Sequence, residues 1–136
     1  MTTDGRVQIQ QAIYAALTGD ATLMGKITGV FDFVPDNQNY PFIQIGEIDF
    51  KDWDSHTFVG FEGEITINLW HRPQSRGRAP LYDIMADINN ILDRNYFTIP
   101  GFSVIVMKYE FSNIIVDPDM VTYHGITRYK IIMGEN

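Results

Sequence analysis

Cysteine is absent from this chain of 136 residues. Its absence excludes disulfide bonds, zinc sites built on cysteine and catalysis by a thiolate. Long apolar runs are also missing, since no stretch approaches the ~18 consecutive apolar residues that mark a membrane-spanning helix. The opening residues, MTTDGRVQ, lack the basic and apolar regions of a secretory signal. We therefore expect a protein that has no membrane segment and needs no covalent crosslink for stability.

Positive charge is scarce. The chain has 10 lysines and arginines against 17 aspartates and glutamates, a formal net charge of -7. This balance argues against a broad surface that neutralises nucleic-acid phosphates, but it does not exclude a wall past which DNA slides without adhering. The length, together with a hydrophobic content of 45%, predicts one globular domain over residues 1–136.

Two segments have the apolar spacing of amphipathic helices. The first covers residues 5–18, where Asp4 is a candidate cap and Gly19 a stop signal. A short additional turn is expected over residues 20–24. The second helix is expected over residues 79–93, with Pro80 suited to its first turn. Its apolar positions are three and four residues apart: Leu81, Ile84, Met85, Ile88, Ile91 and Leu92.

Strands are expected at residues 30–34, 41–48, 61–70, 103–116 and 121–133, where apolar and polar residues tend to alternate. The strand over 103–116 is long, so a bend or bulge is expected near Lys108–Asn113. Asp117-Pro118-Asp119 predicts the turn of a C-terminal hairpin, followed by an exposed Tyr123-His124-Gly125 step. The predicted fold is α+β: an antiparallel sheet of four to five strands flanked by two main helices, in the order α-β-β-β-α-β-β.

No group of residues favours catalysis or metal binding over a structural role. The histidines His56, His71 and His124 are not paired at ligand spacing. Asp117 and Asp119 open like a calcium loop, but Pro118 interrupts them and the later ligands are missing. Glu62 and Glu64 share one strand face and could imitate the carboxylate pair of a glycosidase. A solvated strand face explains them better. We expect no catalytic residue, no metal and no cofactor; a small enzyme with an unrecognised site is the competing class.

Two clusters favour contacts with other proteins. Residues 51–60 form a loop in which Trp53, Asp54, His56 and Phe58 are candidates for partner docking. The alternative is that the aromatic rings fold back onto the sheet. Arg72, Arg76 and Arg78 form the only basic cluster of an acidic chain. They are candidates for ion pairing with carboxylates of a neighbouring subunit, and the alternative is a solvated turn.

Several motifs in chain order carry a resemblance to a known family. They are Leu17 at the end of the first helix, Val34-Pro35, the run Pro41 to Glu47, Leu69-Trp70-His71-Arg72, Gly77-Arg78, Ile91-Leu92-Asp93, Asp117-Pro118-Asp119 and His124-Gly125. In this order and spacing the chain resembles the tail-completion family of tailed bacteriophages, which includes tail terminators and tail-to-head joining proteins.

The resemblance implies a non-enzymatic protein of the virion, assembled in the host cytoplasm. It implies a ring of identical copies, commonly a hexamer, on the head-proximal end of the tail tube. One face of the ring would meet the tail tube protein and end its polymerisation. The other face would meet a neck or head-completion protein, and DNA would pass through the lumen without sequence-specific binding. The alternative is another ring protein of the neck or tail, either a stopper or a tube subunit.

Overall fold

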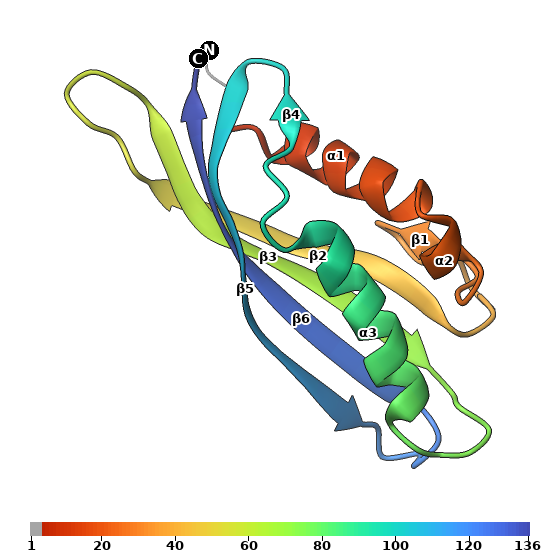
Figure 1. The fold of residues 1–136 in the computed structure, drawn as a ribbon. Coiled ribbons are helices and arrows are strands. Elements are labelled where there is room, and N and C mark those ends of the chain that lie inside the picture. Colours follow the sequence, from red (N-terminus) through yellow and green to blue (C-terminus); the bar gives the residue numbers. More distant parts are fainter. Residues whose placement is uncertain (1–3) are drawn as a thin grey trace.

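One curved sheet of six strands organises the computed structural model, which describes residues 4–136 (Figure 1). The strands lie in the order β1-β2-β3-β6-β5-β4. Their bounds are Val30–Phe31 for β1, Phe42–Asp52 for β2, Gly60–His71 for β3, Thr98–Ile99 for β4, Phe102–Val116 for β5 and Tyr123–Glu135 for β6.

The predicted sheet of four to five antiparallel strands is corrected in two respects. The sheet has six strands, because Thr98–Ile99 adds a short strand at the margin beside β5. It is also mixed, because β1 runs parallel to β2, with Val30 opposite Ile43. Strand β4 has two residues, which is too short to produce a periodic signal in the sequence. Strand β1 was predicted over residues 30–34 and covers residues 30–31. The four long strands are antiparallel, as expected, and the α+β class holds.

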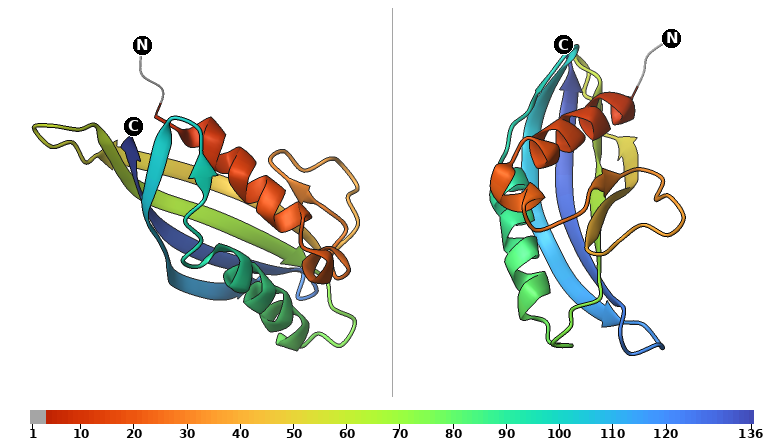
Figure 2. Two further views of the ribbon diagram at one scale, coloured as in Figure 1. Left: turned by 45° about the horizontal axis from the view of Figure 1, so that its top comes forward. Right: turned by 90° about the vertical axis from the view of Figure 1, so that its right-hand side faces the viewer.

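The helices lie on one face of the sheet (Figure 2). They are α1 (Arg6–Thr18), the one-turn α2 (Ala21–Met24) and α3 (Ala79–Leu92). In α1 the residues Ile9, Ile13 and Leu17 recur every four positions and are fully buried. In α3 the stripe of Leu81, Ile88 and Leu92 is buried in the same core. The opposite face of the sheet has no helix over it in residues 4–136.

The helix starts differ from the predicted cap. Gly5 is the N-cap of α1, in a left-handed conformation. Glycine has no side chain that could accept a hydrogen bond from the backbone N–H groups of the first turn. The Asp4 carboxylate instead accepts from the Arg6 backbone N–H at 3.1 Å and pairs with the Arg6 guanidinium. A side-chain cap occurs at α2, where the carboxylate of Asp20 accepts from the Leu23 N–H at 2.9 Å.

Strand β2 extends four residues beyond its predicted end and has a register shift between Ile45 and Ile48. The polar residues of this extension, such as Asp49 and Lys51, lie on the helix-free face, where charge is tolerated. Gly63 on β3 is needed where the two strands approach most closely. A Cβ at Gly63 would lie 1.7 Å from the backbone oxygen of Asp49. The expected bulge in β5 is present between Tyr109 and Phe111.

The Asp117-Pro118-Asp119 segment makes the turn of the β5–β6 hairpin, as predicted. The Asp117 N–H donates to the Thr122 carbonyl at 2.9 Å, and the Met120 N–H donates to the Asp117 carbonyl at 2.9 Å. The expectation of an exposed step after the turn is wrong. Tyr123 is buried, because its side chain lies on the helix-facing side of β6 and its hydroxyl donates to the Arg76 carbonyl.

Candidate functional site

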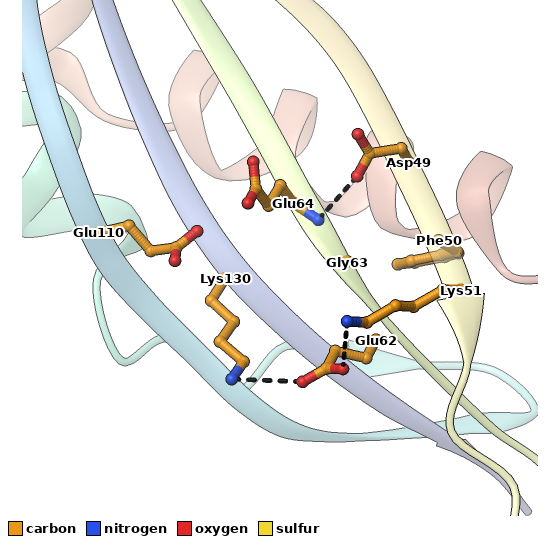
Figure 3. A pocket seen from close by; sticks show the side chains of 8 residues that line it. All are labelled: Asp49, Phe50, Lys51, Glu62, Gly63, Glu64, Glu110 and Lys130. Carbon is orange, nitrogen blue, oxygen red and sulfur yellow. Dashed lines mark hydrogen bonds and ion pairs between the residues drawn. The ribbon is translucent and has the colours of Figure 1, made fainter.

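A chain of alternating charges crosses the helix-free face of the sheet at β2, β3 and β6 (Figure 3). Glu62 accepts from Lys51 on one side and Lys130 on the other, each at 3.2 Å. The hydrogen bond from Lys51, followed by that from Lys130, lowers the pKa of Glu62. A shallow groove of about 410 Å³ surrounds these side chains. A general acid needs a raised pKa, so this carboxylate is suited to holding strands together and not to donating a proton.

An aromatic pair lies further along the same face. The rings of Trp70 and His124 stack with centroids 3.8 Å apart and planes inclined by 10°. The Nε2 atom of His124 lies 2.8 Å from the Asn68 Oδ1 atom. Burial is the main cause that lowers the pKa of His124. The neutral ring therefore serves as a flat packing surface near neutral pH.

The three histidines lie in separate environments. His56 is exposed at the tip of the β2–β3 hairpin, and His71 is half-buried at the end of β3. Burial lowers the pKa of His71, and its Nδ1 atom has no hydrogen-bond partner within residues 4–136. Within residues 4–136 no group of three metal-ligating side chains converges.

The docking candidates of residues 51–60 form the narrow tip of the β2–β3 hairpin. Trp53 and Phe58 pack edge to face, with centroids 5.6 Å apart. The Asp54 carboxylate accepts from the Gly60 N–H at 2.8 Å and so fixes the neck of the tip. Phe58 is half-buried against the strand ends, whereas 38% of Trp53 is exposed. The tip extends beyond the helices (Figure 1), and His56 is exposed in it.

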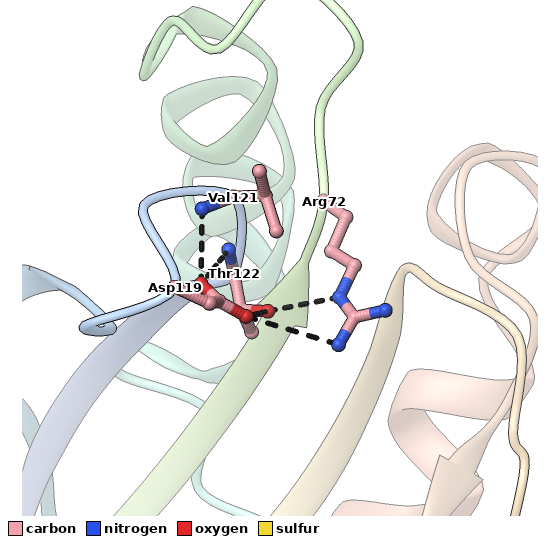
Figure 4. A network of polar contacts seen from close by, with 4 residues as sticks. All are labelled: Arg72, Asp119, Val121 and Thr122. Atoms are coloured by element: carbon pink, nitrogen blue, oxygen red, sulfur yellow. Dashed lines mark hydrogen bonds and ion pairs between the residues drawn. The ribbon is translucent and has the colours of Figure 1, made fainter.

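The three arginines separate into two environments. The Nε of Arg72 donates to the Thr122 hydroxyl at 2.8 Å, and its guanidinium lies 4.5 Å from the centre of the Tyr40 ring. Figure 4 shows how Arg72 also reaches Asp119, at 3.9 Å. Arg72 is thus used within the subunit. Arg76 and Arg78 are exposed and form no ion pair with the residues that the structure describes.

The two candidate clusters lie at opposite ends of β3. The aromatic tip precedes Gly60, and the arginine loop follows His71.

One feature near these clusters is missing from the sequence-based prediction. Strand β5 forms most of one margin of the sheet, and several of its large apolar side chains are exposed: Ile105, Tyr109, Phe111 and Ile115. The strand itself follows from its residues, but the sequence does not show which strand ends up at a margin. Apolar residues on both faces of the run at 103–116 are the available signal.

Comparison with known proteins points to one family. A family model described as tail completion protein gp17 matches residues 11–134. The tail completion protein gp17 of Bacillus phage SPP1 is 23% identical over 128 residues, covering 94% of this chain and 93% of that protein. A chain in the virion of a native gene transfer agent particle has the same fold. Its TM-score is 0.88 at 16% identity, with 98% of this chain and 99% of that chain covered. Among the described residues, no helix is long and apolar enough to cross a membrane.

Proposed function

The chain belongs to the family of tail completion protein gp17, and on this premise we propose that it closes the head-proximal end of a phage tail tube as a ring. As a member of this family it is a component of the virion tail or neck. In the proposed role, the ring ends polymerisation of the tail tube protein and joins the tail to the head. No covalent bond is made or broken in this process.

The observation that carries the proposal is the extent of the family match. It covers residues 11–134, and the curated relative is matched over nearly its whole length. The match therefore includes nearly all of the fold described above.

The shape of the subunit suggests how the two faces of the ring are used. The hairpin tip with Trp53 and His56 is the proposed contact with the last ring of tube protein, because an exposed aromatic ring on an ordered hairpin is a good anchor. The opposite end, with Arg76 and the Asp117–Asp119 turn, is proposed to meet the neck or head-completion protein. The net charge of -7 suits a lumen through which DNA passes without sticking.

A tube subunit is the second candidate, and the long β2–β3 hairpin favours it. Tube proteins need long hairpins that line a continuous channel, and β2 and β3 have 11 and 12 residues here. The two roles differ in self-assembly. A tube subunit polymerises alone into filaments, whereas a terminator stays monomeric or forms single rings.

Sizing the purified protein separates these roles. Light scattering and electron microscopy are applied to the protein alone and to its mixture with purified tail tubes. The proposal expects monomers or single rings alone and rings at one end of the tubes in the mixture. Long filaments of the protein alone would establish the tube role instead.

A hairpin variant tests the contact with the tube. In this variant a two-residue Asn-Gly turn, which closes antiparallel hairpins well, replaces residues 53–60, between the paired Asp52 and Phe61. The fold should be kept, but tubes should no longer be capped. Gln11→Ala on the exposed side of α1 is the matched control and should cap normally. Normal capping by the hairpin variant would remove the tip from the contact.

A further inference from the structure

Half of β5 has no partner on the side away from β6. Strand β4 pairs only with Phe102 and Ser103. The end of α3 then covers the next stretch, where the Arg94 N–H donates to the Met107 carbonyl and the Asp93 carboxylate accepts from the Tyr109 N–H, each at 2.8 Å. From residue 110 to 116, no strand of residues 4–136 pairs with this side (Figure 1).

The other margin of the sheet is open in the same way. Strand β1 pairs only with Ile43 and Gln44 of β2. Residues 48–52 of β2 pair with β3, and residues 46–47 form the irregularity before them; none of residues 46–52 has a strand on the far side within the described chain. Each open margin lies beside a helix. A groove of about 360 Å³ separates α3 from β5, and one of about 200 Å³ separates α1 from β2.

Open margins of this length are usually protected in a protein that works alone, by charge, proline or a covering segment. In β5 the exposed side chains include Phe111 and Ile115, which are 41% and 48% exposed. A strand with open backbone groups and exposed apolar side chains is a site for the addition of another strand.

Charge indicates which strand is added. Three cations lie at or near the open part of β5: Arg78 in the groove, Arg128, whose guanidinium is 5.3 Å from the centre of the Phe111 ring, and Lys108, two residues before the open part begins. None of the three is ion-paired within the part of the chain that the structure describes. Glu110 at the bulge offsets one of these charges.

The open part of β2 has the opposite sign. Glu47, Asp49 and Asp52 are exposed and have no ion-pair partner in residues 4–136. Lys51, on the same strand, is already paired with Glu62. The open part of β5 and the open part of β2 are therefore complementary in charge. Two copies of the same margin would repel each other.

Strand direction fits the same arrangement. The strands β2, β3, β6 and β5 alternate in direction across the sheet. Suppose that a second copy is related to the first by rotation about an axis roughly parallel to the strands. Its β2 would then lie antiparallel to β5 of the first copy. The contact is heterologous, since each copy uses one β5 and one β2, and such contacts form a ring when the rotation between copies closes.

The register sets the stagger between copies. Across the sheet Asp52 is level with Val104, whereas Gln44 is level with Asn113. The open part of β5 is thus offset from the open part of β2, and neighbours must shift along the strand direction. Closed sheets have such a shift, because their strands are tilted to the axis.

We infer that the ring is closed by strand pairing, with residues 110–116 of β5 in one copy antiparallel to residues 46–52 of β2 in the next. This inference rests on the proposed ring and specifies its subunit interface. The sheets of all copies then form one continuous wall around the ring.

Introduced cysteines test the interface, since the natural chain has none. Asn113→Cys and Ile115→Cys are made separately on β5, and Glu47→Cys and Asp52→Cys separately on β2. Each β5 variant, enlarged by a tag, is mixed with each β2 variant and with tail tubes, and the mixture is oxidised. Gln11→Cys on α1 replaces the β2 variant in the control.

The inference expects at least one β5–β2 disulfide between copies, at a yield about tenfold above the Gln11→Cys control, because neighbours in a ring have a high effective concentration. Equal yields with the control, or a dominant β5–β5 disulfide, would overturn it. Sizing of the same mixtures distinguishes a failure of the strand pairing from a failure of the proposed function. If rings cap the tubes without a β5–β2 disulfide, only the strand pairing is wrong. If no ring forms and no β5–β2 disulfide appears, the proposed function fails as well.

Discussion

At the scale of the residue, His71 and His124 link stability to pH. Burial lowers the pKa of both below the ordinary 6.5. Between the lowered and the ordinary pKa the unfolded chain binds more protons than the folded chain. The stability is thus fully present above about pH 6.5 and decreases as the pH falls through the lowered values.

We expect the melting temperature to fall between about pH 7.5 and pH 5.5, where ordinary histidines become protonated. Thermal melts of the natural chain and of the double variant His71→Gln and His124→Gln provide the measurement. The variant should show a flatter profile over this range. Parallel profiles would mean that other groups cause the dependence.

Asp119 is the residue that holds the β5–β6 turn. Its Oδ1 accepts from the N–H groups of Val121 and Thr122 at 2.9 and 2.8 Å, and its Oδ2 accepts from the Thr122 hydroxyl (Figure 4). The side-chain hydrogen bond from Thr122 is the largest cause that lowers the pKa of Asp119 to about 2. The contribution to stability is therefore present above the ordinary value of 3.8 and is lost as the pH falls through about 2.

Replacing Asp119 by alanine should lower the melting temperature and speed hydrogen exchange at the amides of Val121 and Thr122. Asp117→Ala is the matched control, because the Asp117 side chain accepts no hydrogen bond in residues 4–136. Equal effects of the two variants would show that the turn depends on negative charge in this segment and not on the hydrogen bonds of Asp119.

Residue chemistry could be predicted from the sequence where it is local. The Asp-Pro-Asp turn follows from proline and aspartate preferences, and the structure confirms it. The contacts of Arg72 could not be predicted, because its partners Thr122 and Tyr40 are distant in sequence. The role of Trp53 and His56 in docking stays a prediction.

At the scale of the element, Gly63 sets the pairing of β2 and β3. A methyl group there would lie 1.7 Å from the Asp49 backbone oxygen, so the strands must separate. Gly63→Ala should lower the free energy of unfolding by about 1–3 kcal/mol, the usual cost of overpacking. Gly77→Ala is the control, since its Cβ would meet only the Ser75 hydroxyl, at 3.7 Å. Chemical denaturation measures both, and equal stability of both variants would contradict the close approach.

The long elements were predictable, and of the short elements α2 and β1 were expected, whereas β4 was not. Helix α3 was placed within one residue, because its apolar stripe is regular and Pro80 marks its start. The end of β2 was placed too early, because Asp49 and Lys51 resemble loop residues until the helix-free face is known. Strands β1 and β4 have two residues each and are defined by their partners.

At the scale of the whole molecule, the fold separates three surfaces. The aromatic hairpin tip lies at one end of β3, the arginine loop and the Asp117–Asp119 turn lie at the other, and the open margins lie along the sides. A subunit of a ring between a tube and a neck needs contacts in these three directions. The family could be recognised from the order of the motifs, and the family match confirms it. The margins could not be predicted, because strand order depends on contacts distant in sequence.

The central claim is that this protein stops the growth of a tail tube by occupying one end of it. The direct measurement is the length of tubes that grow from purified tube protein, followed by electron microscopy as increasing amounts of this protein are added. The account predicts that growth stops once the added protein is sufficient to cap every tube, with one ring at one end of each. Tubes that keep growing at an excess of this protein, or rings spread along the tube walls, would contradict it.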